Sequence, residues 1–410
     1  MRIVYLNPCG QMGGAETSLR ELLAGIRAAK PDWQLCLVLG EDGPLAGIVE
    51  KLGVRVIVAP FPRALARLGD ARRGAFAVGW SLLTAVFATA LYARRLAARL
   101  RAIQPDVIHT NGFKMHLLGI WTRPRGTSVV WHIHDYVSSR PLMGRLLRHH
   151  SQNCTAAIAN SHSVAADLST LMPGLKVLTI YNAVDLARFG PAGSTVDLDA
   201  LAGLSPAPAG TVRVGLVATF ARWKGHKVFL RALSELSGNT PIRGYVIGGP
   251  IYQTTGSQYG LAELEEERNR LGLTDRVGFT GFLNDTAGAI RSLDIVVHAS
   301  TEPEPFGMVI IEAMASAKPL IASRAGGAAE LFDEEHTGLG HAAGDATGLA
   351  RQIERLAADP ALGARLGEAA RAAAEQSFRL DRMAGEAIRL YNECHGAKQE
   401  AAALMPSLNT

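Results

Sequence analysis

Two carboxylates bracket an apolar run in the second half of the chain. The stretch "TEPEPFGMVIIEAMA" places Glu304 and Glu312 eight positions apart, with Pro303 and Pro305 at its start. A proline lacks an amide donor and biases the residue before it away from helical angles, so a helix can begin only after Pro305. Glu304 therefore belongs to a loop, and Glu312 lies about two turns into the helix.

These two acids suit hydroxyl groups better than phosphates. A carboxylate repels a phosphate, but it accepts hydrogen bonds from the hydroxyls of a ribose or another sugar. The amides at the helix start, on Phe306, Gly307 and Met308, remain for anions. The next loop, "RAGGAAE", opens more backbone. The run predicts a site for a ligand that carries both hydroxyl and phosphate groups.

A second loop carries positive charge. The run "VGLVATFARWKGHKVFLRAL" passes from a strand-like segment into Arg222, Lys224 and His226, and then into a helical pattern. Cations beside a helix N-terminus suit a diphosphate, which needs both charge and hydrogen-bond donors. Solvated loop charges are the alternative interpretation.

Glycines mark two further turns. The first strand-like run leads into Gly13 and Gly14 at the start of a helical pattern, and the later run "VIGGP" ends in Gly248 and Gly249. Glycines in such places let a ligand approach the backbone. Because a tight turn in any α/β protein also needs glycine, these residues alone do not separate binding from folding.

Histidines gather near one strand-like run, "SVVWHIHDY". His132 and His134 lie on one face of this strand, because side chains alternate along it. Three interpretations stay open: with His109 they ligate a metal, they are core histidines, or one of them touches a substrate. The position of His134 at the end of the strand favours contact with a ligand.

The elements that must position these residues repeat one pattern. Short, nearly continuous apolar runs alternate with helical patterns in both halves of the chain, which is typical of a parallel sheet covered by helices on both faces. We expect an α/β protein with two Rossmann-like doubly wound domains, at residues 1–190 and 211–375, facing each other across a cleft that holds the ligand. Residues 191–210 form the linker, 376–395 a C-terminal helix that crosses back to the first domain, and 396–410 a flexible tail. The acidic triplet "DLD" at 197–199 falls in the linker, so we expect no metal site.

Composition and charge narrow the class of protein. The 410 residues suffice for two cores, and four scattered cysteines exclude a zinc ribbon or disulfide scaffold and indicate a reducing compartment. No N-terminal signal segment is evident, so we expect a cytoplasmic protein. Residues 1–190 hold 22 Lys/Arg against 11 Asp/Glu, and the remainder 20 against 26. The basic half indicates an anionic surface or substrate, although an uneven spread of solvated charge would look the same.

Residues 74–93 form an uncharged run flanked by arginines. Twenty such residues are about enough to span a bilayer, but the run continues into a strand of the first domain, which a spanning helix would divide. We favour a buried or surface-docked helix, followed by contact with the inner face of the membrane.

Taken together, these motifs resemble the retaining glycosyltransferases of family GT4, which have the two-domain GT-B architecture. The motifs that carry the resemblance are "EPFGMVIIEAMA" with "AGGAAE", "GGAE" at 13–16, "HD" at 134–135, "YNAVDLARF" at 181–189 and "WKGH" at 223–226. They span nearly the whole chain in the family's order.

The resemblance assigns roles to single residues. It implies that Glu312 contacts the ribose, that Glu304 and the amides of Phe306 and Gly307 contact the transferred sugar, and that Lys224 binds the diphosphate. His134 would lie beside the sugar, and Gly14 would approach the phosphates. The expected catalytic residues are His134, Glu304, Lys224 and Arg222. The expected donor-binding residues are Gly13, Gly14, Thr219, Gly248, Gly249, Phe306, Gly307, Met308 and Glu312.

The resemblance also implies the reaction. We expect a metal-independent, retaining transfer of a sugar from a UDP- or GDP-linked donor to a glycan or lipid-linked acceptor, in cell-envelope polysaccharide or glycolipid synthesis. No cofactor and no nucleic acid partner are expected. A nucleotide-sugar 2-epimerase and a non-catalytic nucleotide-sugar-binding subunit remain as alternatives.

One departure from the family generates a test. The family has an arginine five or six residues before the lysine, where this chain has Ala218 and Thr219. We hypothesise that Arg222 supplies the missing charge, so Arg222→Ala should weaken donor binding. Unchanged donor affinity in a calorimetric titration would contradict the hypothesis.

Overall fold

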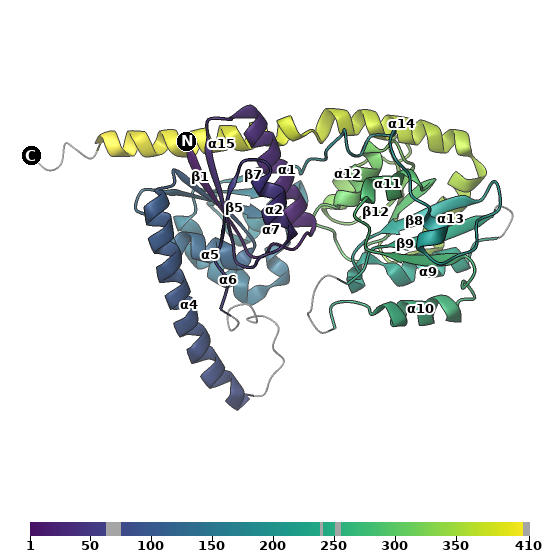
Figure 1. Ribbon diagram of the computed structural model, residues 1–410, viewed down its shortest axis with the longest axis horizontal. Coiled ribbons are helices and arrows are strands. Elements are labelled where there is room, and N and C mark those ends of the chain that lie inside the picture. The colour runs from purple at the N-terminus through teal and green to yellow at the C-terminus, as the bar shows by residue number, and fades with distance from the viewer. Residues whose placement is uncertain (63–74, 238–240, 251–255, 405–410) are drawn as a thin grey trace, which may run out of the picture. The chain divides into compact units, whose positions relative to one another are not determined.

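The chain divides into two compact units, each built on its own sheet. The computed structural model describes residues 1–62, 75–237, 241–250 and 256–404 (Figure 1). Unit 1 combines residues 1–181 with the C-terminal stretch from Leu380, and unit 2 comprises Asn182–Arg379. The stretch from Leu380 onward therefore completes the fold of unit 1, although unit 2 separates it from residues 1–181 along the chain.

Sheet A of unit 1 has seven parallel strands in the order β3-β2-β1-β4-β5-β6-β7. Its strands are β1 (Arg2–Asn7), β2 (Gln34–Leu39), β3 (Arg55–Val58), β4 (Val107–Asn111), β5 (Ser128–Ile133), β6 (Ala156–Ala159) and β7 (Val177–Thr179). The helices are α1 (Gly14–Ala29), α2 (Pro44–Glu50), α4 (Ala75–Ile103), α5 (Phe113–Thr122), α6 (Pro141–His150), α7 (His162–Leu171) and α15 (Leu380–Leu404), with short 3₁₀ turns η1 (Val137–Ser139) and η2 (Ser151–Asn153).

Sheet B of unit 2 has six parallel strands in the order β10-β9-β8-β11-β12-β13. They are β8 (Val212–Val217), β9 (Ile242–Ile247), β10 (Val277–Gly281), β11 (Ile295–His298), β12 (Leu320–Ser323) and β13 (Leu339–His341). The helices are α8 (Leu198–Leu201), α9 (His226–Ser234), α10 (Leu261–Arg270), α11 (Thr286–Arg291), α12 (Met308–Ala315), α13 (Ala346–Ala358) and α14 (Pro360–Ser377), with η3 (Arg222–Lys224) and η4 (Gly327–Glu330).

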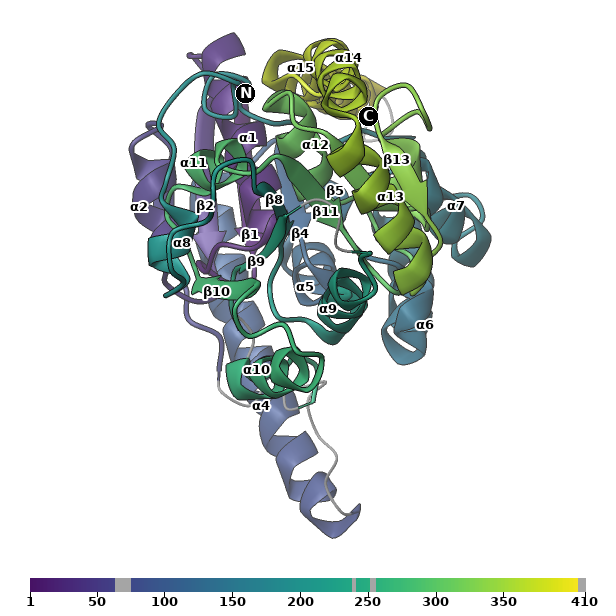
Figure 2. The same ribbon diagram turned by 90° about the vertical axis from the view of Figure 1, so that its right-hand side faces the viewer.

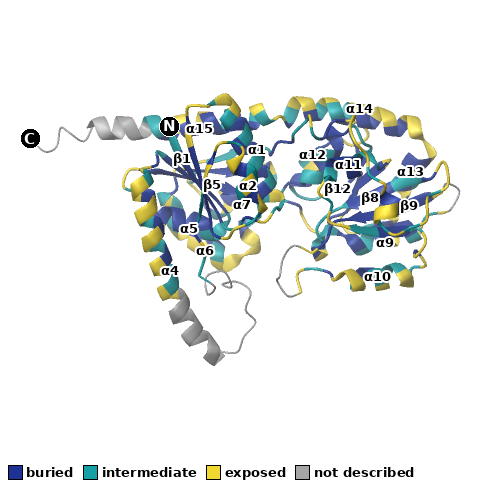
Figure 3. Ribbon diagram, viewed as in Figure 1, coloured by how far each residue is buried: buried dark blue, intermediate teal, exposed yellow. Residues whose placement is uncertain are grey.

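Burial explains why these strands read as continuous apolar runs. Strands β4, β5, β9 and β11 are buried along their whole length, and the central strands of both sheets are dark blue in Figure 3. Helices cover both faces of each sheet (Figure 1, Figure 2), so the central strands are shielded from water on both sides. The predicted fold, two Rossmann-like α/β sheets, is confirmed.

The strand orders locate one switch point in each unit. The chain runs outward from β1 to β3 and then returns to β4 beside β1, and it repeats this from β8 to β10 and back to β11. At such a reversal the loops after two neighbouring strands diverge and leave room at the carboxyl ends of the strands, which is where open α/β sheets bind ligands. In unit 2 the loops concerned follow β8 and β11.

The boundaries differ from those expected from the sequence. The expected linker, residues 191–210, lies inside unit 2 and includes α8. Asp199 in this segment is buried and pairs with Arg243 at 2.6 Å, and it accepts a hydrogen bond of 2.6 Å from Tyr245. Small residues suggested a linker here, but the segment is part of the fold of unit 2. The buried Asp199 anchors it through Arg243 and Tyr245.

The C-terminal helix belongs to unit 1. Helix α15 packs along α1. The hydroxyl of Tyr391 on α15 lies 2.8 Å from His109 Nδ1 and forms a hydrogen bond with it. Helix α15 starts at Leu380 instead of residue 376 and continues to Leu404, so most of the expected tail is helical, while 405–410 lie outside the described residues.

The uncharged run at 74–93 contributes about the first two thirds of α4. Residue 74 lies outside the described residues, and the helix begins at Ala75. No helix among the described residues is long and apolar enough to cross a membrane. Tyr92, Leu96 and Leu100 are buried at one-turn spacing, which docks this part of α4 on unit 1.

One glycine allows the two switch-point loops of unit 2 to approach each other. Gly225 has φ +76°, and a Cβ there would lie 1.8 Å from the Ala299 carbonyl oxygen. Gly210 has nearly the same φ, +79°, but a Cβ there would have no atom of the described residues within 4 Å. Substitutions at these two glycines therefore separate the effect of crowding, which is present only at Gly225, from the effect of the left-handed backbone, which both share.

We expect Gly225→Ala to destabilise unit 2 by about 1–3 kcal/mol more than Gly210→Ala, because only the former forces β11 and the loop after β8 apart. Urea unfolding followed by tryptophan fluorescence measures the difference. Equal losses of unfolding free energy in the two variants would show that the two loops can move apart without cost.

Candidate active site

An ion pair joins the two loops at the switch point of unit 2. Lys224, at the end of η3, donates to Glu304 Oε1 at 2.7 Å and to Oε2 at 2.9 Å. The backbone links the same loops, because the Thr301 amide donates to the Trp223 carbonyl at 2.8 Å. The two motifs that the sequence singled out separately, 80 residues apart, therefore form one site.

Glu304 is held in place from several sides. Its side chain is buried, and Oε2 also accepts from Ser300 Oγ at 2.7 Å and lies 3.2 Å from His298 Nε2. Its amide donates to the Ala325 carbonyl at 3.2 Å. Pro303 and Pro305, exposed or half-buried on either side, keep this residue in an extended loop.

The electrostatic balance at Glu304 favours the carboxylate. Burial alone would raise its pKa, but the Lys224 ammonium and the hydrogen bond with His298 outweigh burial and hold the pKa of Glu304 well below its ordinary value. Glu304 is thus an anion at neutral pH, and it holds Lys224 in one position.

Lys224 keeps capacity for a further anion. Both hydrogen bonds described above go to a single carboxylate, whereas an ammonium has three donors. Its Nζ lies 4.0 Å from the centre of the Trp223 ring, and its side chain is 20% exposed. A partly desolvated cation of this kind is suited to bind a phosphate oxygen.

Arg222 has a different partner from the one hypothesised. Its guanidinium forms two hydrogen bonds with Glu263, of 3.0 and 2.8 Å, and lies 4.5 Å from the centre of the Tyr259 ring. Lys227 shares the same carboxylate at 3.2 Å. Arg222 would have to leave Glu263 to serve a diphosphate, so its expected role stays a prediction.

The start of α12 faces the same switch point. Gly307 precedes the helix with φ +102°, and Met308 is the first residue of the helix. The free amides of the first turn therefore lie beside the loop that carries Glu304. The Phe306 side chain is buried and packs edge-on against Phe378, which leaves only its backbone for a ligand. Glu312 is the fifth residue of α12, about one turn after Met308 instead of the expected two, and it is half-buried.

The paired glycines after β9 have a packing role. A Cβ on Gly248 would lie 2.1 Å from the Ala218 carbonyl oxygen, and one on Gly249 would lie 2.9 Å from the Phe282 ring. The loops after β8 and β9 are therefore in close contact. Thr219, on the first of these loops, is half-buried beside them.

In unit 1, the three histidines separate into two environments. His109 and His132 are buried within sheet A, 3.2 Å apart through Nε2 and Nδ1, and His109 also contacts Tyr391. His134 follows β5 at the carboxyl edge, half-buried, with Nε2 3.2 Å from Asn111 Oδ1. Burial lowers the pKa of His134 to about 4 and that of His109 to about 3, so both rings are neutral at pH 7.

These environments distinguish core packing from contact with a ligand for the three histidines. Core packing accounts for His109 and His132, and His134 is the histidine placed at the ligand-binding edge. No group of three or more His, Cys, Asp or Glu residues suited to a metal ion occurs among residues 1–62, 75–237, 241–250 and 256–404. At the same edge, Gly13 precedes α1 and Gly14 begins it, with the latter exposed.

Sequence reasoning missed three residues of this environment. His298 and Ser300 support Glu304, and Asn111 contacts His134. Each lies at the end of a strand, in "IVVHAS" and "VIHTN". Polar residues where an apolar strand ends were the available signal, because open α/β sheets bind ligands at the carboxyl ends of their strands.

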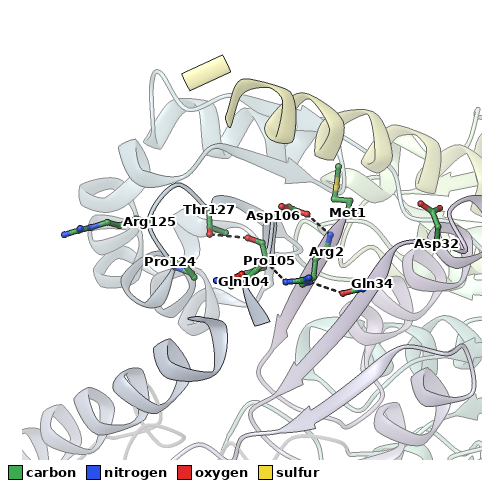
Figure 4. A pocket seen from close by; sticks show the side chains of 10 residues that line it. All are labelled: Met1, Arg2, Asp32, Gln34, Gln104, Pro105, Asp106, Pro124, Arg125 and Thr127. Carbon is green, nitrogen blue, oxygen red and sulfur yellow. Dashed lines mark hydrogen bonds between the residues drawn. The ribbon is translucent and has the colours of Figure 1, made fainter. Parts of the chain in front are cut away.

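A separate hollow lies at the opposite edge of sheet A. It has a volume of about 520 Å³ and is lined by residues at or before the starts of strands, including Arg2, Asp32 and Asp106 (Figure 4). Arg2 there donates to Gln34 at 2.9 Å, and its amide donates to Asp106 at 2.8 Å. The polar groups of this hollow form hydrogen bonds with one another between the starts of neighbouring strands. The hollow lies at the amino edge of sheet A, whereas the candidate site lies at a carboxyl edge.

Two family models match the chain. The model described as Glycosyl transferases group 1 matches residues 205–373, and the model described as Glycosyltransferase Family 4 matches residues 12–188. The first match contains both the Lys224 loop and the Glu304 loop, and the second contains His134.

Curated relatives align with both halves. The lipopolysaccharide core biosynthesis mannosyltransferase LpcC of Rhizobium leguminosarum bv. viciae is 31% identical over 301 residues, covering 68% of this chain and 83% of that protein. The N-acetyl-alpha-D-glucosaminyl L-malate synthase of Bacillus anthracis is 27% identical over 257 residues, covering 62% of this chain and 64% of that protein.

Solved structures share the fold. Anabaena Alr3699/HepE in complex with UDP and glucose is 25% identical with a TM-score of 0.77, covering 96% of this chain and 99% of that one. Sucrose-phosphate synthase from Thermosynechococcus elongatus is 22% identical with a TM-score of 0.77, covering 97% and 100%.

We expect Glu304→Gln to destabilise the protein at pH 7 by about 3 kcal/mol, because it leaves the Lys224 ammonium without its buried partner. Since the pKa of Glu304 is lower in the folded state, its stabilising effect is complete above the unfolded pKa of about 4.3 and is lost as pH falls below that value. The difference in urea midpoint between wild type and variant should be constant from about pH 7 to 5 and shrink below.

Glu302→Gln is the matched control, since Glu302 is exposed two residues earlier. A difference for Glu304→Gln that does not change with pH, or one no larger than the control's, would contradict the proposed ion pair.

Proposed function

The chain belongs to the group 1 glycosyltransferases of family GT4, and from this we propose that it is a retaining enzyme that transfers a sugar from a nucleotide diphosphate to a glycan or lipid-linked hydroxyl. The observation that carries the proposal is the Lys224–Glu304 pair at the switch point of unit 2. It combines a cation for a diphosphate with a carboxylate for sugar hydroxyls at the edge where such sheets bind ligands.

The donor's parts find matching groups in unit 2. We assign the diphosphate to Lys224 and the first-turn amides of α12, the transferred sugar to Glu304, and the ribose to Glu312. The lysine and the amides supply the positive field that stabilises the leaving group, so the proposal requires no metal or other cofactor. A UDP-linked donor is supported by the UDP and glucose bound in the similar Anabaena protein.

The proposed chemistry keeps the configuration of the anomeric carbon. The bond from this carbon to the diphosphate oxygen breaks as the acceptor oxygen bonds from the same face, and the acceptor proton passes to the leaving phosphate. Lys224 stabilises the negative charge that develops on that phosphate. The products are a nucleoside diphosphate and a glycoside.

A double displacement through Glu304 is less favourable in this geometry. Both of its oxygens already accept hydrogen bonds, from Lys224 and from Ser300, and His298 lies within hydrogen-bonding distance. Each such bond stabilises the anion and makes it a weaker nucleophile. Glu304 is thus better suited to orient the lysine and the sugar than to attack carbon.

The acceptor and the compartment follow from different observations. Two curated relatives, LpcC and the Rhizobium meliloti protein LpsD, are named for lipopolysaccharide core biosynthesis, which supports a cell-envelope glycan or glycolipid acceptor. All four cysteines are unpaired thiols, and three are buried, which supports the reducing cytoplasm and the inner face of the membrane as the site of action.

A panel of UDP-, GDP- and ADP-sugars tests the proposal. We expect slow nucleotide release from one donor, faster release with a glycan acceptor, and, by NMR, the donor's anomeric configuration in the product. An inverted product would contradict retention. Acceptor-independent release with an epimerised sugar would identify an epimerase, and tight binding without turnover a non-catalytic subunit.

His134 is tested in the same assay. We expect His134→Ala to lower kcat by about 10²-fold, the scale for loss of one polar group at a reaction centre, with a smaller change in donor affinity. His150→Ala should leave kcat within about twofold, because His150 is the last residue of α6, which leads from the carboxyl end of β5 back toward the start of β6. Full activity of His134→Ala would remove this residue from the reaction.

A further inference from the structure

Helix α6 presents apolar side chains to solvent. Gly144 and Leu147 form its buried side, whereas Leu142 is 78% exposed and Leu146 is 42% exposed. The two exposed leucines are four residues apart, so they lie on the same face one turn apart, opposite the buried side. Unit 1 folds without covering them.

A tryptophan at the end of the neighbouring helix enlarges this apolar area. Trp121 on α5 is 47% exposed, and its ring packs edge-on against His150 at the end of α6, with centroids 5.6 Å apart. Helices α5 and α6 lie side by side on one face of sheet A (Figure 1, Figure 2). A large amphipathic ring is thus held at the rim of the leucine face.

The same surface is basic. Arg145 lies beside Leu142 at the edge of the leucine face, and Arg148 lies one turn further along the helix on the same side. Both are exposed, and neither has an ion pair among the described residues. The helix contains no Asp or Glu. We call Trp121, Leu142, Leu146 and the two arginines the α5–α6 surface.

Helix α4 extends this character on the other side of α5. In its described part, Val86 is 65% exposed and Phe87 is 74% exposed, and the exposed Arg94 and Arg95 follow within about two turns. Helix α4 packs against α5. Three consecutive helices on one face of sheet A therefore combine uncovered apolar side chains with arginines.

We propose that the α5–α6 surface, with α4 beside it, docks unit 1 onto an anionic lipid bilayer. Exposed apolar side chains enter the boundary between headgroups and acyl chains, while arginines around them attract anionic headgroups. The proposal rests on the proposed function in one respect, because a lipid-linked acceptor lies in the membrane.

Charge selects the membrane over other occupants. A second copy of this chain, paired through the same surface, would bring Arg145 and Arg148 of each copy together without acidic partners on α6. A neutral protein partner would leave the arginines without a role. An anionic bilayer matches both the leucines and the arginines.

Co-sedimentation of the full chain with vesicles tests the proposal without any sugar donor. We expect binding to phosphatidylcholine vesicles that contain phosphatidylglycerol, weak binding to phosphatidylcholine alone, and weaker binding as salt increases. Leu142→Glu with Leu146→Glu should reduce the partition coefficient about tenfold or more, and so should Arg145→Glu with Arg148→Glu.

Unit 2 offers matched controls. Leu201 and Leu261 are both 45% exposed, and Arg351 and Arg365 are exposed arginines without an ion pair among the described residues. The corresponding double glutamate variants of unit 2 should bind vesicles as wild type does. The same loss in these variants would assign binding to net charge or general hydrophobicity and overturn the proposed surface.

Three further results would also overturn it: no binding of wild type to anionic vesicles, equal binding to neutral ones, or unaltered binding of both α6 variants. Thermal unfolding at the wild-type temperature checks that the variants fold. Nucleotide release with a soluble acceptor should be unchanged in them, so failure of docking and failure of the glycosyltransferase proposal give separate results.

Discussion

The candidate site depends on one interaction, the ion pair between Lys224 and Glu304. Two loops from neighbouring strands of sheet B supply its partners, and neither partner is fully hydrated. A buried carboxylate without a cation would take up a proton or cost several kcal/mol, and a lysine without a carboxylate would have no fixed position. The pair therefore stabilises the switch point and prepares it for an anionic ligand.

Several local features make this pair possible. Gly225 allows the loop after β8 to approach the carbonyl of Ala299, and the backbone bond from Thr301 to Trp223 closes the contact. The prolines on either side of Glu304 keep it extended until α12 begins. Substitutions that change the backbone here would alter the site as much as the loss of a charged group would.

The sequence predicted the layers of the fold and the elements that carry Glu304 and Glu312, for physical reasons. Strands buried on both faces read as apolar runs, and the prolines set the start of α12, so Glu304 and Glu312 could be placed on a loop and a helix. It did not predict which groups pair. The bond between Arg222 and Glu263 spans 41 residues, and the support of Glu304 by Ser300 depends on a turn whose path no periodicity encodes. The segment 191–210 looked like a linker because small residues dominate it, whereas the buried ion pair of Asp199 anchors it.

Calorimetric titration of UDP into wild type, Lys224→Gln and Lys227→Gln tests the central claim most directly. Lys227 is a cation three residues further on that pairs with Glu263. We expect the Lys224 variant to bind UDP about ten- to a hundredfold more weakly, the scale of one charge-assisted hydrogen bond, and the Lys227 variant to match wild type within about twofold. Equal affinities for all three proteins would show that the diphosphate is bound elsewhere.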